Sequence, residues 1–171
     1  RYRPQDRGFD ESVWFPSSHI GSVSDFWGND YFDDTYWHNG KKQKYEGYCT
    51  DIFFNESIRF IEESIDQDKP FFAYIATNTP HGPLYPKQED YEVLEKLFEK
   101  SKFANQKGLK SVLVKYLSMI RNIDSNVGDL ANFLDTKGVI DDTIIIFLTD
   151  NGSTMGKLYF NAGMRGMKTE L

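Results

Sequence analysis

Apolar side chains recur at helical spacing in three segments of the chain, with polar and charged side chains between them. Residues 51–66 carry one apolar face, and Thr50 precedes them in the position of a helix cap. Residues 88–100 show the same pattern in a shorter segment. In residues 111–136 the apolar positions follow each other by three or four without a break, and Lys137-Gly138 stands where a C-terminal cap is expected. Three helices are therefore predicted, and the third is the longest.

Two short runs consist almost entirely of apolar residues and lack any helical period. Residues 71–76 read Phe-Phe-Ala-Tyr-Ile-Ala, and residues 143–148 read Thr-Ile-Ile-Ile-Phe-Leu. Runs of this length suit strands that are covered on both faces, as in a parallel sheet. A strand, a long helix and a second strand form a crossover, which makes the two strands parallel. The pattern predicts an α/β fold in which both runs end at the same edge of one sheet.

The first 48 residues favour loops and short strands. Residues 9–15 are a candidate strand that Pro16 ends, and Asn39-Gly40 between residues 31–37 and 42–45 is a strong signal for a β-hairpin. Aromatic residues make up 16% of the chain and gather in this part. Packing of a loop-rich region is the favoured interpretation, since aromatic side chains bury large areas. A stacking wall for a sugar or aryl ligand is the alternative.

Length, charge and cysteine content exclude several classes of protein. The chain has 171 residues, a net charge of −6 and 39% hydrophobic residues, which fits one folded domain and not a disordered chain. The acidic balance argues against nucleic acid as a partner, and no apolar run is long enough to span a membrane. Cys49 is the only cysteine, so neither an internal disulfide nor a cysteine-built metal site is available. We expect Cys49 to be a small buried residue.

Polar residues that can perform chemistry follow each of the two predicted strands. His81 lies between two prolines after the first run, and Asp150 and Asn151 follow the second. Carboxylate and amide oxygens suit Ca²⁺ or Mg²⁺, and a histidine beside such an ion can bind an anionic oxygen or transfer a proton. Each feature also has a simpler interpretation, since Asp-Asn-Gly is common in turns and a proline-flanked surface histidine is often inert. His19 and His38 are both interpreted as turn residues.

Several blocks of the chain, in this order and spacing, resemble the motifs of the sulfatase family. The main ones are a hydrophobic strand followed by Pro-His-x-Pro, an Ile-Asp-x-x-Val-Gly helix, a strand followed by Thr-Asp-Asn-Gly, and an Arg-Gly-x-Lys segment; here they are residues 71–83, 123–128, 144–152 and 165–168. Residues 7–10 and 48–51 also fit the family's usual course. The resemblance covers nearly the whole chain.

The resemblance implies a fold, a reaction and a set of site residues. The fold would be the alkaline-phosphatase-like sandwich of sulfatases, a mainly parallel sheet flanked by helices and truncated here. Asp150 and Asn151 would be Ca²⁺ ligands, and His81 and Lys168 would be the catalytic and substrate-binding residues. The reaction would be hydrolysis of a sulfate ester, with a sulfated glycan among the candidate substrates. Such enzymes are usually periplasmic, extracellular or lysosomal.

The family's nucleophile is missing from the sequence. It is a formylglycine made from Cys or Ser in a Cys/Ser-x-Pro/Ala-Ser-Arg motif, and no such motif occurs in the 171 residues. We therefore expect residues 1–171 to be the central part of a sulfatase catalytic domain, with an aromatic loop and hairpin region at 1–48 and an α/β core at 49–171. Alone, this part should be inactive, bind calcium weakly and tend to self-associate. No nucleic-acid or membrane partner is expected.

Two other functions remain open from the sequence. A phosphodiesterase or phosphonate monoester hydrolase of the same superfamily would share the sheet and the metal-binding blocks. A non-catalytic glycan-binding domain would use the aromatic residues in the first third of the chain. It would not explain why His81, Asp150 and Asn151 are predicted at the same edge of the sheet.

Overall fold

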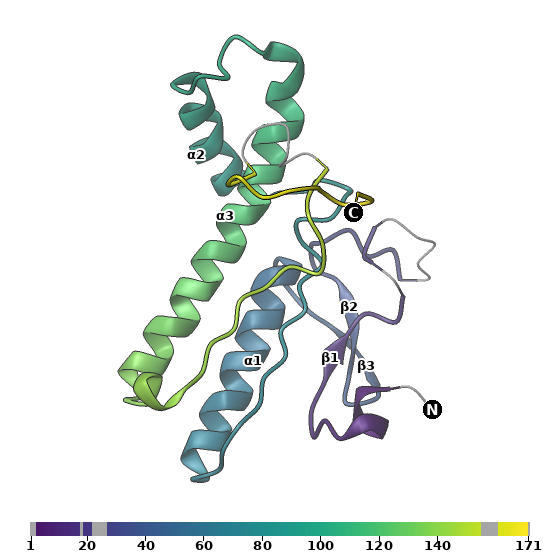
Figure 1. The fold of residues 1–171 in the computed structure, drawn as a ribbon. Helices are drawn as coiled ribbons and strands as arrows, with labels where there is room; N and C mark the ends of the chain where they lie inside the picture. Colours follow the sequence, from purple (N-terminus) through teal and green to yellow (C-terminus); the bar gives the residue numbers. More distant parts are fainter. Residues whose placement is uncertain (1–2, 18, 22–26, 155–160, 171) are drawn as a thin grey trace.

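The computed structural model describes residues 3–17, 19–21, 27–154 and 161–170. Within these ranges the regular structure consists of the helices α1 (Cys49–Asp66), α2 (Gln88–Glu99) and α3 (Lys107–Thr136), two short 3₁₀ helices, Pro4–Arg7 and Ile140–Asp142, and one small sheet (Figure 1). None of the described helices is both long enough and apolar enough to cross a membrane.

Helices α2 and α3 form a hairpin, as the spacing of their apolar residues predicts. Their shared core contains Phe98, Leu113 and Val114, which are all buried. The end of α3 is also confirmed: Gly138 has φ +70°, its N–H donates to the carbonyl of Asp135, and the N–H of Val139 donates to that of Leu134. This is a Schellman cap, which glycine favours because it adopts a positive φ without a Cβ clash. The helix starts at Lys107, four residues before the predicted position.

Helix α1 occupies the predicted segment, but Thr50 does not cap it. Tyr48 holds the N-cap position without a side-chain hydrogen bond, and Thr50 lies inside the first turn. The Thr50 side chain is buried, and its Oγ1 is 2.7 Å from Oγ1 of Thr79. Thr50 therefore fastens the start of α1 to the segment that leads into residues 80–83.

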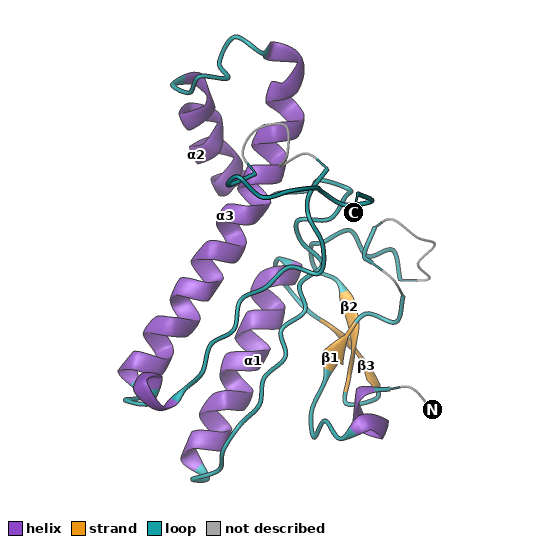
Figure 2. Ribbon diagram, viewed as in Figure 1, coloured by secondary structure: helices purple, strands orange, loops and turns teal. Residues whose placement is uncertain are grey.

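The predicted hairpin is confirmed. Strands β1 (Val13–Trp14), β2 (Thr35–His38) and β3 (Lys41–Lys44) pair antiparallel in the order β1-β2-β3 (Figure 2). Asn39 and Gly40 have φ of +49° and +79°, the positive values that a tight two-residue hairpin turn requires.

Aromatic side chains build the core between this region and the helices, which confirms the packing interpretation. The larger cluster of buried residues consists of four tyrosines, one cysteine and three aliphatic side chains. Its members are Tyr31, Tyr36, Tyr45, Tyr48, Cys49, Ile20, Ile52 and Met119. Burial raises the pKa of the Cys49 thiol to about 12, so this cysteine is a packing residue, as expected.

The two predicted parallel strands are wrong for this structure. Residues 71–76 and 143–148 are extended loops that run in the same sense in Figure 2, and neither is paired into a sheet of the described residues. Phe72 is 73% exposed and Ile144 is 89% exposed. A strand is defined by hydrogen bonds to a neighbouring strand, and the described residues offer these runs no such neighbour. The regular sheet that is present is antiparallel, not the expected parallel one.

We expect the exposed apolar runs to drive self-association. Replacing Ile144 by lysine should lower the association constant, because it places a charge on an 89% exposed apolar position of an unpaired segment. Leu97→Lys is the matched control, since Leu97 is 56% exposed on α2, away from both runs. Light scattering over a concentration series gives the oligomeric state. A wild-type chain that stays monomeric at every concentration would contradict the prediction.

Candidate functional site

His81 is exposed, while its backbone is held from two sides. Its N–H donates to the carbonyl of Asn78 at 3.1 Å, and its own carbonyl accepts a hydrogen bond from the buried Tyr31 hydroxyl at 2.8 Å. Its ring Nδ1 lies 2.8 Å from the carbonyl of Gly82. The backbone of His81 is therefore fixed in position, while its imidazole is open to solvent.

A second histidine, His19, lies against His81. The two ring centroids are 4.2 Å apart. The N–H of Ile20 donates to Oδ1 of Asn78 at 2.9 Å, and a Cβ on Gly21 would lie 3.0 Å from Pro83. Residues 19–21 therefore pack directly on residues 78–83, and only glycine permits the close approach at position 21.

The surroundings of His19 disfavour protonation of its imidazole. Partial burial, the charge of His81 and the charge of Lys168 all lower its pKa, in that order of importance. His19 is half-buried against His81, which corrects its interpretation as an exposed turn residue. Its Ser and Gly neighbours in the sequence carry no signal of this contact, which is made with a segment far along the chain.

The third and fourth blocks, residues 144–152 and 165–168, are also brought close together. A Cβ on Gly152 would lie 3.0 Å from Cα of Met167 and 3.3 Å from the backbone nitrogen of Lys168. Gly152 therefore lies against residues 167–168. Lys168 is half-buried, and its positive charge is one of the causes that lower the pKa of His19. Of the predicted residues, His81 thus contacts the His19 ring, and Lys168 is close enough to influence the same ring.

Asp150 and Asn151, which precede Gly152, are exposed. Among the described residues, no side-chain hydrogen bond or ion pair joins either of them to His81 or Lys168. Their oxygens are hard ligands of the kind that Ca²⁺ takes, and both lie next to each other in the chain. Ca²⁺ binds six to eight oxygens, so the two side chains fit the ion in kind and supply part of its shell.

A different cluster could be mistaken for a metal centre. Ligand atoms of Glu11, His38 and Glu56 lie within 4.8 Å of one another. The guanidinium of Arg59 pairs with both glutamates, at 3.0 Å for Glu56, and the Tyr45 hydroxyl is 2.7 Å from Nδ1 of His38. The positive charge that these carboxylates need is therefore supplied by arginine. His38 is half-buried in this network, which corrects its interpretation as an exposed turn residue.

Asp51 is a polar residue whose importance the sequence did not reveal. Its carboxylate accepts hydrogen bonds from Nδ2 of Asn122 at 2.7 Å, from Nδ2 of Asn126 at 2.8 Å, and from the ammonium of Lys87 at 2.8 Å. It therefore ties α1 to α3 and to the segment before α2. Burial alone would raise the pKa of Asp51, but the hydrogen bonds from Lys87, Asn126 and Asn122 outweigh it and lower the pKa below its ordinary value.

Comparison with known families shows which family has this order of sequence blocks. The sulfatase family model matches residues 5–170. The chain belongs to the sulfatase family. One relative, the uncharacterized sulfatase YdeN of Escherichia coli, is 27% identical over 99% of this chain and 27% of its own length. The arylsulfatase of Klebsiella aerogenes is 23% identical over 92% of this chain and 42% of its own length.

A solved structure has the same fold over this part of the molecule. Ps i-CgsB superimposes with a TM-score of 0.75 at 27% identity, over 96% of this chain and 37% of the solved chain. The same protein in complex with k-i-k-neocarrahexaose gives a TM-score of 0.72 at 28% identity, over 91% of this chain and 35% of the solved one. This sulfatase chain thus spans about a quarter to two fifths of the length of these relatives.

Proposed function

We propose that the protein to which residues 1–171 belong is a sulfuric ester hydrolase, and that these residues supply one side of its active site. The observation that carries the proposal is the ring contact between His19 and His81, with Lys168 near enough to lower the pKa of His19 and Gly152 packed on the Met167-Lys168 backbone. Three segments widely separated in a sulfatase-family chain are thereby linked at one edge, and each contains a residue type that an anionic ester requires.

Each residue has a role that its chemistry supports. The ammonium of Lys168 binds an oxygen of the sulfate group and offsets its negative charge. The imidazolium of His81 donates a proton to the departing alcohol oxygen as the sulfur–oxygen bond breaks. His19, whose pKa is lowered, is the histidine less suited to carry a proton, so its role is to accept or donate a hydrogen bond beside His81. A Ca²⁺ ion held by Asp150 and Asn151 would supply further positive charge at the sulfate oxygens.

The nucleophile is proposed to lie outside these 171 residues. The family's formylglycine arises from a motif that the sequence does not contain. Cys49 does not take this part, because its thiol is buried and its pKa is raised to about 12.

We propose a sulfated glycan as the substrate class. The support is the solved relative at 28% identity, which was determined in complex with k-i-k-neocarrahexaose. The net charge of −6 means that an anionic ligand needs local positive charge, which Lys168 would supply.

An activity assay tests the proposal. The protein encoded by the complete open reading frame should hydrolyse 4-nitrophenyl sulfate and should not hydrolyse bis(4-nitrophenyl) phosphate. The 171-residue chain serves as the control: it should show no turnover, and calorimetric titration should give calcium binding weaker than micromolar, because Asp150 and Asn151 cover only part of the shell. Preferred hydrolysis of the phosphodiester would replace the sulfatase assignment with the phosphodiesterase one.

A further inference from the structure

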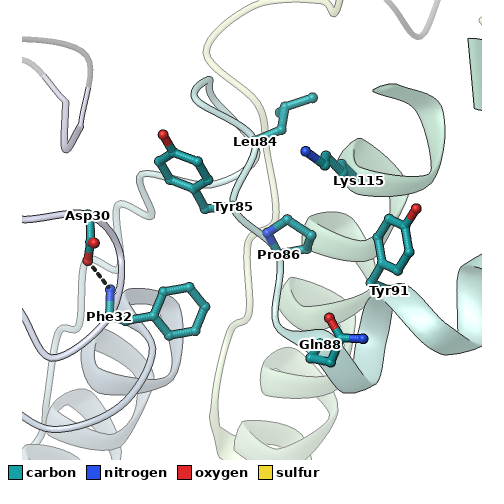
Figure 3. A pocket seen from close by; sticks show the side chains of 8 residues that line it. All are labelled: Asp30, Phe32, Leu84, Tyr85, Pro86, Gln88, Tyr91 and Lys115. Carbon is teal, nitrogen blue, oxygen red and sulfur yellow. Dashed lines mark hydrogen bonds between the residues drawn. The ribbon is translucent and has the colours of Figure 1, made fainter. Parts of the chain in front are cut away.

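A cavity of about 380 Å³ lies between the loop at residues 30–32, residues 84–86 and the α2–α3 hairpin. Figure 3 shows Phe32 and Tyr85 on one side of it, Tyr91 and Lys115 on the other, and Pro86 between them. Phe32 is 41% exposed and Tyr85 is 47% exposed, so both rings offer accessible surface. None of these residues belongs to the site described above.

The lining has the composition that a sugar ring requires. Aromatic faces carry partial negative charge and attract the C–H face of a pyranose, while a few polar groups at the rim fix its hydroxyls. Asp30 and Gln88 provide a carboxylate and an amide at the rim. The volume is that of a small-ligand pocket.

Lys115 adds a preference for an anionic ligand. It is half-buried and lines the cavity, and none of the ion pairs seen among the described residues includes it. An ammonium group at the wall of a largely aromatic cavity is best matched by a sulfate or carboxylate on the sugar.

The loop that presents Phe32 is held rigid before any ligand binds. The buried carboxylate of Asp34 accepts hydrogen bonds from the N–H groups of Asp30 at 2.9 Å and Tyr31 at 3.2 Å, and from the Tyr36 hydroxyl at 2.7 Å. Tyr31 has φ +85°, which is rare for an aromatic residue and is maintained by this network. A pre-formed wall lowers the entropy cost of binding.

The cavity is connected to His81 through Tyr31. The Tyr31 hydroxyl donates to the carbonyl of His81 at 2.8 Å, and the Tyr31 ring meets that of Tyr85 edge to face at 5.8 Å between centroids. Tyr31 therefore contacts the wall of the cavity through its ring and the backbone of His81 through its hydroxyl, whereas Tyr85 makes no contact with His81 among those described.

We propose that this cavity binds a ring of an anionic oligosaccharide adjacent to the ring whose sulfate ester is cleaved. The identity of that neighbouring ring rests on the proposed function. The binding surface itself, formed by Tyr85, Tyr91 and Phe32 with Lys115 as the anion contact, does not.

Calorimetric titration of the complete protein with k-i-k-neocarrahexaose tests the proposal. Tyr85→Ala should weaken binding about tenfold, which is what the loss of one stacked ring costs. Tyr85→Phe keeps the ring and should bind like the wild type. Lys115→Gln should weaken binding by a similar factor, whereas Lys96→Gln, the same change on an exposed residue of α2, should have no effect.

A small substrate distinguishes the role of this cavity from that of the proposed active site. Binding and hydrolysis of 4-nitrophenyl sulfate, which has no second sugar ring, should be unchanged in all four variants, and thermal melting confirms that each is folded. Equal hexasaccharide affinity in the wild type, Tyr85→Ala and Lys115→Gln would overturn the proposal, as would no hexasaccharide binding by the wild type. Failure of the proposed function is a separate result: the wild type would then leave the aryl sulfate intact, whatever the hexasaccharide does.

Discussion

Replacing Asp150 by alanine is expected to abolish sulfate-ester hydrolysis by the complete protein while leaving its fold in place. Asp150 is exposed, so its removal should cost little stability. As a proposed ligand of Ca²⁺, however, it holds the charge that stabilises the sulfate oxygens as the ester bond breaks. Loss of one such electrostatic contributor typically lowers kcat by about 10²–10³-fold.

The assay compares kcat/KM for 4-nitrophenyl sulfate between the wild type and Asp150→Ala, with circular dichroism as the check on folding. Asp141→Ala is the matched control, because Asp141 is an exposed aspartate in the 3₁₀ helix ahead of residues 143–148. It should retain full activity. If Asp150→Ala were equally active, the Asp-Asn-Gly sequence would be a turn and nothing more.

Replacing Asp51 by alanine should lower the free energy of unfolding by about 2–4 kcal/mol. The reason is that three donors lose their shared acceptor: Asn122 and Asn126, which are 4% and 8% exposed, and the ammonium of Lys87. Nδ2 of Asn126 keeps a second hydrogen bond, to the carbonyl of Asn122 at 2.9 Å, but the buried amide of Asn122 loses its acceptor and pays the desolvation cost. Denaturant unfolding of the wild type and the variant measures the difference.

Asp66→Ala provides the control for this measurement. Asp66 is an exposed aspartate at the end of the same helix, and its replacement should change stability by no more than about 0.5 kcal/mol. A similar small loss in Asp51→Ala would show that the hydrogen bonds to Asp51 are not maintained in solution.

The contribution of Asp51 should also depend on pH with a definite sign. Its pKa in the folded protein lies below its ordinary value, so the unfolded state binds more protons in the interval between the two. Its stabilising effect is therefore fully present above about pH 4, and is lost as the pH falls through the folded pKa. The gap in stability between the wild type and Asp51→Ala should be constant near neutrality and shrink in acid. A gap of constant size down to pH 2.5 would contradict this.

The aromatic residues divide into two groups that the sequence could not separate. Tyr31, Tyr36 and Tyr48 are buried in the core, and their composition signal was interpreted correctly as packing. Phe32, directly beside Tyr31, instead points its ring to the cavity in Figure 3. Which of two adjacent aromatic residues is buried depends on the turn conformation set by Asp34, and hence on contacts rather than composition.

The sequence by itself determined the local elements and the family. Helices α1, α2 and α3 follow from apolar spacing, and the hairpin follows from Asn39-Gly40, because both signals act between residues only a few positions apart. The family motifs were likewise legible, since they are short blocks in a fixed order and the family model matches residues 5–170.

Only the tertiary structure decided how distant segments use their side chains. In the folded chain His19 contacts His81, and Thr50 pairs with Thr79 and does not cap a helix. Asn122 and Asn126 both donate hydrogen bonds to Asp51. None of these pairs is close in the sequence, so no periodicity or motif encodes them. The same reason explains the error over residues 71–76 and 143–148. An apolar run reports the environment that a strand needs, but pairing depends on a neighbouring strand, and that is a property of the assembled fold and not of the run.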